Sequence, residues 1–289
     1  MPELPEVETV VRTLRQLVLG KTIGSVSVLL PRIIRRPDDM EEFKAMLVGQ
    51  TIHEIKRRAK FIQFILDRDV LISHLRMEGR YGLYRSDEPV EKHTHVIFHF
   101  TDGTELRYRD VRQFGTMDLF PLGKETVEGP LAKLGVEPLA EEFTPEVLRS
   151  LLKGRTTKIK PLLLNQECIV GLGNIYVDES LFRARIHPER PAGKLTAQQV
   201  AKLHEAIVAT LSEAVEQGGS SVKSYVNGQG EMGMFQQSLL VYGRKGEPCV
   251  NCGTEIIRFV VGGRGTHICP ACQKTAVTRK KGAQQPKGG

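Results

Sequence analysis

Four cysteines near the C-terminus constrain the fold of this chain more than any other feature. They form two pairs with two residues inside each pair and sixteen between the pairs: Cys249, Cys252, Cys269 and Cys272. Two thiolate pairs at this spacing are typical of a structural zinc site. Residues 255–261 and 266–269 have the pattern of strands joined by the glycine-rich turn 262–265. The sequence therefore predicts one zinc ion bound to a β-hairpin, and four reduced thiols without metal fit this spacing poorly.

The charge of the chain indicates a negatively charged partner. Its 289 residues carry 41 lysines and arginines against 34 acidic residues, a net charge of +7. Part of the excess lies in residues 274–289, a basic stretch without acids that is typical of a disordered tail. The acidic N-terminus excludes a secretory signal, and no apolar run approaches the ~20 residues of a membrane span. We therefore expect a cytoplasmic protein.

Changes of pattern divide the chain into an N-terminal domain, a middle domain, a finger and a tail: 1–130, 131–234, 235–273 and 274–289. The first part opens with apolar residues at helical spacing, which predict a helix ending before Gly20. Alternating segments then predict strands, the last two joined by the turn at 102–103: 61–66, 70–77, 94–101 and 105–110. These patterns predict a β-sandwich or barrel with the opening helix packed on it.

The middle part changes to a helical pattern. A threonine followed by proline at 144–145 is typical of a helix start, and 196–199 forms a capping box. Between them, 169–176 carries glycines that allow a tight turn between helices, and the helix N-terminus at Asn174 can bind a phosphate. A simple packing turn explains these glycines equally well. We expect an α+β protein of several domains.

Pro2 is the most unusual candidate for chemistry. If Met1 is removed, Pro2 presents a free secondary amine beside Glu3. An α-amino group titrates near ~7.7–8.0, so a sizeable fraction is unprotonated at neutral pH and can attack an aldehyde carbon. The plainer explanation is a helix start, in which Pro5 and nearby acids suit the positive helix end. If Met1 is retained, the Pro2 nitrogen is an amide and no such nucleophile exists.

Five segments together resemble the bacterial formamidopyrimidine-DNA glycosylases, which excise 8-oxoguanine. They are the four-cysteine finger and the runs PELPE at 2–6, HLRMEG at 74–79, RDVRQFG at 109–115 and GNIY at 173–176. The resemblance extends from Pro2 to Gln273. It implies an N-terminal β-sandwich, a helix-two-turn-helix middle domain and a zinc-bound hairpin. Leu4 favours the purine-directed branch, because the related endonuclease VIII typically has glycine there and prefers oxidised pyrimidines.

The resemblance implies a bifunctional glycosylase and AP lyase. Pro2 would attack C1′ of the damaged nucleoside, expel the base and form an iminium, after which β- and δ-elimination break both flanking phosphate bonds. Glu3 would act as general acid and base. Glu6 would support the site from the same helix start.

The resemblance also assigns residues that bind the DNA backbone. Lys60 would contact the phosphate and lesion region and is grouped with Arg264 in the catalytic set, although a solvated basic surface is the plain alternative for Lys60 alone. Asn174 and Arg264 match phosphate-binding positions. His93 and Tyr242 are weaker candidates for backbone contacts.

A glycosylase must also extrude its target base and fill the gap. Phe114 matches the residue that wedges between base pairs, Met77 the one that fills the vacated space, and Arg112 the one that binds the orphaned cytosine. In isolation Met77 and Phe114 are more often core residues. The charged residues around them, including Glu78, argue instead for exposed loops.

The glycine-rich segment 218–234 aligns with the loop that closes over the extruded base in this family, and a plain linker is the alternative. Ser220, Val222 and Ser224 are its expected contact positions. Gln113 and Asn165 depart from the family, which usually carries a cation and an aspartate there. Both weaken local charge complementarity without touching the proposed catalytic atoms.

The resulting prediction is a zinc-containing monomer that binds damaged double-stranded DNA and no membrane, and that associates with the nucleoid when bound. A non-enzymatic zinc protein that binds bent or gapped DNA is the competing hypothesis. It accounts for the finger, the charge and the turn at Asn174. It gives no reason for the Pro2-Glu3 pair.

Overall fold

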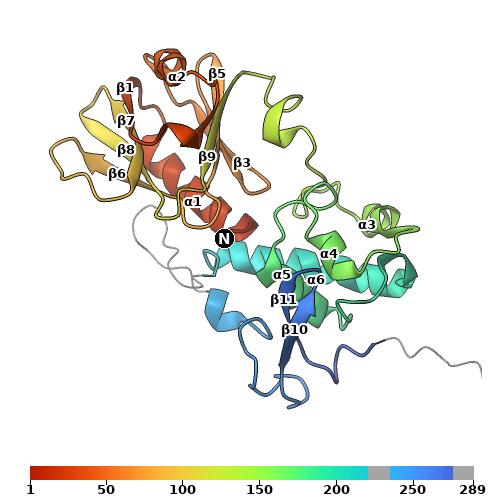
Figure 1. Ribbon diagram of the computed structural model, residues 1–289. Helices are drawn as coiled ribbons and strands as arrows, with labels where there is room; N and C mark the ends of the chain where they lie inside the picture. The colour runs from red at the N-terminus through yellow and green to blue at the C-terminus, as the bar shows by residue number, and fades with distance from the viewer. Residues whose placement is uncertain (221–234, 276–289) are drawn as a thin grey trace, which may run out of the picture.

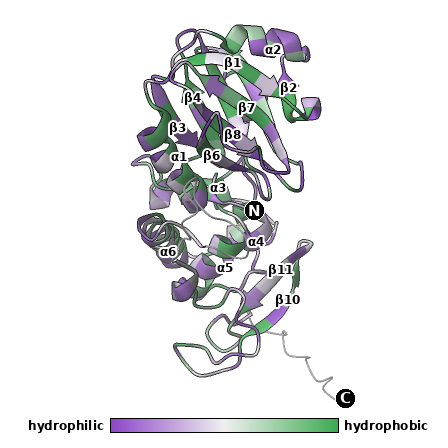
Figure 2. Cartoon of the chain, turned by 90° about the vertical axis from the view of Figure 1, so that its left-hand side faces the viewer, coloured by the Kyte–Doolittle hydropathy of each residue, from purple (hydrophilic) through white to green (hydrophobic). Residues whose placement is uncertain are grey.

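The computed structural model describes residues 1–220 and 235–275, which form two halves that meet near the N-terminus of the chain (Figure 1). The N-terminal half consists of two β-sheets with a helix packed on them. The C-terminal half consists of helices and a two-stranded hairpin, and Figure 2 shows it beneath the sandwich. The expected α+β architecture, with a β-sandwich, a helical region and a hairpin, is confirmed.

The two sheets have four and five strands. The first is built from β1 (Ile23–Val28), β7 (Thr94–Phe100), β8 (Thr104–Arg109) and β6 (Arg80–Arg85), in that order. The second is built from β2 (Ile34–Arg36), β9 (Thr116–Pro121), β5 (Asp69–His74), β4 (Phe61–Ile65) and β3 (Glu54–Arg58). Within these two sheets β2 and β9 pair in parallel, and the other neighbouring strands pair antiparallel. The helix α2 (Met40–Leu47) contacts β1 and β2 at one edge.

The strand β5 is buried along its whole length, and its central residues 70–72 are all apolar. Leu71 packs into the main core between the sheets, whereas Val70 and Ile72 pack on the opposite face against Leu131. A strand buried on both faces has no polar alternation. The expected strand 70–77 nevertheless ends at His74, because the amide of Gly79 bonds the Leu75 carbonyl at 2.9 Å and closes a turn.

The helix α1 (Leu4–Val18) joins the two halves. Glu3 and Glu6 form a capping box at its start, and Gly20 ends it with a positive φ of 75°. Its apolar stripe, with Val10 and Leu14, is buried in the sandwich core. Leu4 packs instead into the helical core. The first residues of the chain are thereby held at the junction of the two halves.

Four helices form the middle of the chain: α3 (Pro145–Leu152), α4 (Ile159–Leu163), α5 (Asn174–Arg183) and α6 (Ala197–Glu216). Both predicted caps are confirmed: the Thr144 hydroxyl accepts from the amide of Val147, and Thr196 forms a capping box with Gln199. Buried residues of α5 and α6 make a second core. Helix α5 begins at Asn174, as predicted, directly after the glycine-containing turn.

The hairpin consists of β10 (Ile257–Val261) and β11 (Arg264–Ile268). Val261 pairs with Arg264, so the turn has two residues, Gly262 and Gly263, with φ of 56° and 76°. It is shorter than the expected turn 262–265, since glycine pairs at positive φ close a two-residue hairpin without strain. The first strand also begins later than the expected residue 255.

Candidate active site

A cleft of about 720 Å³ opens where the two halves and the hairpin meet. Its lining brings together the four residues predicted to be catalytic, which come from the N-terminus, the turn between β3 and β4, and the start of β11: Pro2, Glu3, Lys60 and Arg264. Pro2 is buried, and Met1 in front of it is half exposed. The cleft is thus assembled from segments more than 250 residues apart in the sequence.

Glu3 connects the N-terminus to helix α5. Its carboxylate accepts hydrogen bonds from the amides of Gly173 at 2.6 Å, Ile175 at 3.0 Å and Tyr176 at 3.4 Å. These amides have no partner inside the helix, and the helix dipole favours a negative charge at this end. Burial is the larger effect: it raises the pKa of Glu3 from its ordinary 4.5 to about 7, against the opposing attraction of Lys60. Glu3 can therefore hold or release a proton near neutral pH.

Glu6 lies one turn further along α1 and is also buried. One carboxylate oxygen accepts from the Glu3 amide at 2.8 Å. The other accepts from the Tyr176 hydroxyl at 2.6 Å and from the Ser220 amide at 2.7 Å. A Cβ at Gly219 would lie 2.8 Å from the same oxygen, so a side chain cannot be added there without a shift. Glu6 therefore links Ser220, which follows α6, to the N-terminal end of α1.

Lys60 is 4% exposed, which excludes the alternative of a solvated basic surface. Its ammonium donates to the Leu172 carbonyl at 2.8 Å, next to the amide that Glu3 binds. Burial lowers the pKa of Lys60 and Arg264 lowers it further, whereas Glu3 and Glu6 act in the opposite direction. A buried ammonium between these carboxylates and Arg264 is a suitable contact for an anionic group entering the cleft.

Glu137 fixes the hairpin that carries Lys60, and no pattern in the sequence indicates this role. Its carboxylate accepts from Arg57 and Arg58, both at 2.9 Å, and from the Ala59 amide at 2.6 Å. The neighbouring Val136 bonds through its backbone to the segment before α5. Residues 136–137 therefore contact both the hairpin that carries Lys60 and the segment before α5, whose Leu172 carbonyl accepts from Lys60.

The hairpin edge of the cleft is anchored by a buried ion pair. Lys160 and Asp178 meet at 2.6 Å with almost no exposure, and Lys160 also donates to the Gly265 carbonyl at 3.1 Å. Asn174 donates to the same carbonyl at 2.8 Å. These bonds fix β11 against α5. The isolated charges of Lys160 and Asp178 within apolar helical stretches were the available sequence signal, and it was missed.

Tyr242 reaches the cleft from the segment before the finger. Glu179 binds this segment: its buried carboxylate accepts from the amides of Leu240, Val241 and Tyr242, each at 2.9 Å. The Tyr242 ring packs edge-on against His267. Tyr242, a weaker candidate for a backbone contact, lies in the lining of the cleft together with Asn174.

The three predicted insertion residues lie on exposed loops. Met77 is 36% and Phe114 53% exposed, so the alternative that they are core residues is wrong. Met77 and Glu78 line the cleft, and Phe114 lies on a separate loop with the Arg112 guanidinium 5.1 Å from its ring centre. The exposure of Met77 and Phe114 leaves both side chains accessible for contact with a partner.

The remaining predicted positions are placed as follows. His93 is half-buried at a positive φ of 69°, beside the loop of Phe114 rather than in the lining of the cleft. Ser220 lines the cleft. Val222 and Ser224 lie outside the described residues. Gln113 accepts a hydrogen bond from Arg32, which brings a cation to the position where the family usually has one.

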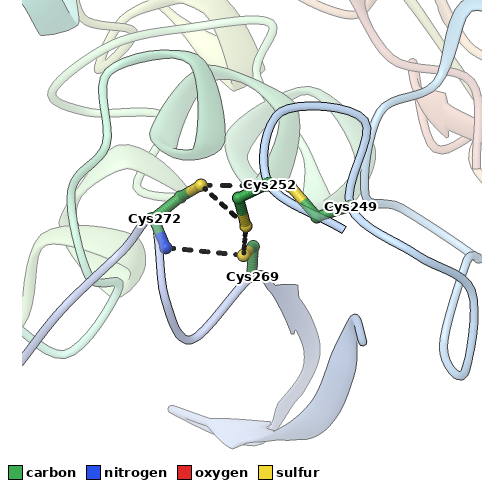
Figure 3. A group of neighbouring side chains, drawn as sticks. All are labelled: Cys249, Cys252, Cys269 and Cys272. Carbon is green, nitrogen blue, oxygen red and sulfur yellow. Dashed lines mark hydrogen bonds between the residues drawn. The ribbon is translucent and has the colours of Figure 1, made fainter. Parts of the chain in front are cut away.

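The four cysteines converge at the base of the hairpin (Figure 3). Their sulfur atoms lie within 4.8 Å of one another, with 3.5 Å between Cys252 and Cys269 and 3.9 Å between Cys249 and Cys272. A tetrahedral zinc ion with Zn–S bonds of about 2.3 Å needs sulfurs about 3.8 Å apart. The donor set therefore fits one structural zinc ion, which the four cysteines bind and which cross-links the two knuckles.

Comparisons with known proteins agree with this architecture. Three families match the chain: the formamidopyrimidine-DNA glycosylase N-terminal domain over 1–117, the formamidopyrimidine-DNA glycosylase H2TH domain over 134–226, and the zinc finger found in FPG and IleRS over 246–275. The formamidopyrimidine-DNA glycosylase of Brevibacillus brevis is 81% identical over 95% of this chain and 99% of its own length. That of Cytobacillus firmus is 64% identical over 94% of this chain and its whole length.

Solved structures of Lactococcus lactis FPG have the same fold. A mutant of that protein in complex with DNA containing Fapy-dG superimposes with a TM-score of 0.89, at 44% identity over 95% of this chain and all of its own. Its complex with DNA containing an abasic site gives 0.88, at 44% identity over 94% of this chain and all of its own. Within residues 1–220 and 235–275, no helix has the length and apolar character needed to cross a membrane.

Proposed function

Since the chain belongs to the formamidopyrimidine-DNA glycosylase family, we propose that it excises oxidised purines from damaged duplex DNA and then cleaves the strand as an AP lyase. Its substrates are 8-oxoguanine opposite cytosine and formamidopyrimidines. The observation that carries this proposal is the cleft whose lining brings Pro2 together with Glu3, a carboxylate with a pKa of about 7, and with the buried ammonium of Lys60. Leu4 supports the purine-directed branch.

The nucleophile is the Pro2 nitrogen after removal of Met1. A bond forms between this nitrogen and C1′, the glycosidic bond breaks, and its electron pair leaves with the base, which takes up a proton. The sugar ring opens to a cationic iminium, and loss of the C2′ proton allows elimination of the 3′ phosphate. A second elimination releases the 5′ phosphate. A secondary amine suits this role because its iminium is cationic without further protonation.

Glu3 is the group that moves these protons. Its pKa near 7 gives it comparable protonated and ionised fractions at neutral pH, which suits one residue acting as acid and then as base. Glu6 holds the Glu3 backbone amide and so fixes the direction in which the N-terminus points. Glu3 is thereby oriented from two helices at once.

Cations and donors around the cleft bind the phosphates on either side of the extruded nucleotide. Lys60 contacts the lesion region, and Arg264 with Asn174 contacts the backbone from the hairpin and from α5. Tyr242 and His93 add contacts further along the strand. These groups come from separate parts of the chain, so together they recognise a kinked strand rather than a straight one.

We assign extrusion of the target base to residues of the exposed loops. Phe114 wedges into the stack, Met77 fills the gap, and Arg112 binds the orphaned cytosine with its planar donors. Glu78 and Ser220, which both line the cleft, face the extruded base. We place the domain boundaries at 1–130, 131–234 and 235–273, followed by a basic tail, and we propose a cytoplasmic monomer associated with the nucleoid.

Borohydride trapping tests the proposal. Incubation with a duplex carrying 8-oxoguanine opposite cytosine should yield a covalent adduct, and peptide mapping should locate it on Pro2 in protein that lacks Met1. A zinc protein that only binds bent DNA would shift the duplex in a gel without forming an adduct. Activity with Met1 retained would overturn the mechanism, and greater activity on thymine glycol than on 8-oxoguanine would move the chain to the endonuclease VIII branch.

A further inference from the structure

Asp110 lies beneath the loop that carries Arg112 and Phe114. It is fully buried, and one carboxylate oxygen accepts from the Arg112 amide at 3.1 Å. The other accepts from the amides of Phe114 at 2.9 Å and Gly115 at 2.8 Å. Three amides of a six-residue segment thus point at one side chain. The tip of the loop is exposed, so these bonds are its main internal restraint.

The Tyr108 hydroxyl extends this arrangement to the loop of Met77. Tyr108 is fully buried, and its hydroxyl lies 3.4 Å from the Asp110 carboxylate. A Cβ added at Gly115 would lie 1.7 Å from the hydroxyl, and one at Gly79 would lie 2.3 Å from it. These two glycines end the loops of Phe114 and Met77. Both loops therefore close on the same buried phenol.

The backbone of Asp110 also holds the His93 segment. Its amide donates to the His93 carbonyl at 3.0 Å, and its carbonyl lies 2.8 Å from Nε2 of the His95 ring. Asp110 is consequently the one described residue bonded to both the Phe114 loop and the His93 segment. None of its contacts reaches the cleft itself.

We propose that Asp110, supported by the Tyr108 hydroxyl, is a positioning residue that fixes the Arg112 and Phe114 side chains for reading the base opposite the lesion. This inference rests on the proposed function. Arg112 can discriminate cytosine only if its planar donors meet the base edge at a defined angle, and a loop of exposed residues cannot supply that angle by itself. Asp110 supplies it before DNA binds, through three amides rather than through contact with DNA.

Replacement of the carboxylate by an amide breaks this arrangement without changing its size. In Asp110→Asn one carboxylate oxygen becomes an NH2 group, which is a donor and cannot accept. Whichever way the amide is turned, that group faces at least one loop amide, so donor meets donor. The loop must then leave its present conformation at Arg112 or at Phe114 and Gly115.

The test measures excision of 8-oxoguanine opposite cytosine and opposite adenine by the full-length zinc-loaded protein. Asp110→Asn should lower the ratio of the two rates by about tenfold, as should Arg112→Ala. The double variant should lose no more than either single variant, because Asp110 acts through Arg112. Tyr108→Phe, which keeps the ring, should lower the ratio by a smaller factor of about two to three, since the lost bond is long.

Asp69→Asn is the matched control, because Asp69 is a buried aspartate of the same domain whose carboxylate accepts from Gln50, remote from the cleft. It should alter thermal stability and leave the ratio unchanged. An unchanged ratio in Asp110→Asn, or additive losses in the double variant, would overturn the inference. If Asp110→Asn does not fold, the inference is tested by the same ratio of excision rates, opposite cytosine and opposite adenine, in Tyr108→Phe. Absence of excision by the parent protein would refute the proposed function instead.

Discussion

The two regions that would meet DNA are built in opposite ways. At the junction of the halves, Glu3 and Lys60 are almost completely buried, and each is bonded to backbone atoms more than 100 residues away. On the insertion loops, Met77 and Phe114 are exposed, and the glycines that end these loops lie against the buried Tyr108 hydroxyl. In the proposed function, the groups that move protons are thus fixed by contacts with distant parts of the fold. The groups proposed to enter the duplex are exposed and can move from solvent into the base stack.

The same device nevertheless recurs in both regions. Glu3, Asp110 and Glu179 are buried carboxylates that each accept hydrogen bonds from three backbone amides. Such groups organise a turn without a metal or a disulfide. Of these three, Glu3 alone also lines the cleft, so the chemical role that we propose falls to it.

Loss of the proton that Glu3 carries should have the largest effect on excision. It would sharpen the contrast between the junction and the insertion loops. Glu3→Gln should slow excision of 8-oxoguanine by about 10³-fold, within the range for removal of a general acid and base. Binding of the same duplex should fall by a smaller factor than the rate, because the cations of the cleft remain, even though the new NH2 group faces a backbone amide from which the carboxylate accepted. Single-turnover kinetics and a filter-binding isotherm measure the two quantities. Glu41→Gln on exposed α2 is the control and should behave as the parent. Equal losses of binding and rate would make Glu3 a structural residue.

The burial of Glu3 also predicts a pH dependence of stability. The folded chain keeps the Glu3 proton up to about pH 7, whereas the unfolded chain releases it near 4.5. Since the folded state binds more protons in this interval, the free energy of unfolding falls as pH rises through it, by on the order of 3 kcal/mol in full. Thermal unfolding between pH 5 and 8 should therefore show a shallower decline in Glu3→Gln than in the parent. Parallel curves would mean that Glu3 is ionised throughout.

Much of the junction could not be predicted from the sequence, whereas the finger could. The cysteine spacing, the caps at Thr144 and Thr196 and the hairpin turn at 102–103 depend on neighbours in the chain, and these predictions are confirmed. The strand β3 is largely polar and carries no apolar alternation, and the parallel pair of β2 and β9 joins distant segments. Neither was predicted.

The site shows the same division between local and distant information. The resemblance named Glu3 and Lys60. Their burial, the bonds of Glu3 to the start of α5 and the bond of Lys60 to Leu172 before it follow only from the folded chain. Glu137 and Asp110 were missed, because each acts on backbone amides whose position depends on the fold. An acidic residue in a loop gives no sign in the sequence that it is a buried organiser.

The insertion loops should show the reverse of the junction: a loss of activity at almost no cost in stability. Phe114→Ala should slow excision by about 10- to 50-fold, because the wedge supplies the few kcal/mol of unstacking. Its melting temperature should remain close to that of the parent, since an exposed substitution changes stability by about 0.5 kcal/mol or less.

Phe98→Ala is the contrasting control, because Phe98 is 2% exposed in the sandwich core and its truncation should cost about 3–5 kcal/mol. Leu122→Ala, at an exposed site outside the cleft lining, should affect neither quantity. A large loss of melting temperature in Phe114→Ala would remove the distinction between the two regions.

Arg264 gives the smallest expected effect and tests whether the hairpin belongs to the junction or to the loops. Its guanidinium is exposed at the first position of β11, while the strand behind it is fixed by the buried Lys160 and Asp178. If Arg264 binds one phosphate, Arg264→Ala should weaken duplex binding by about three- to tenfold and should reduce the slope of log K against log salt concentration by about 0.9. The zinc content should stay at one ion per chain, because the cysteines lie at the other end of the hairpin. Arg149→Ala, an exposed arginine of α3 outside the cleft, should leave the slope unchanged. A weaker affinity with an unchanged slope would mean that Arg264 shapes the cleft rather than contacting a phosphate, and the hairpin would then resemble the buried junction in its role as well as in its anchoring.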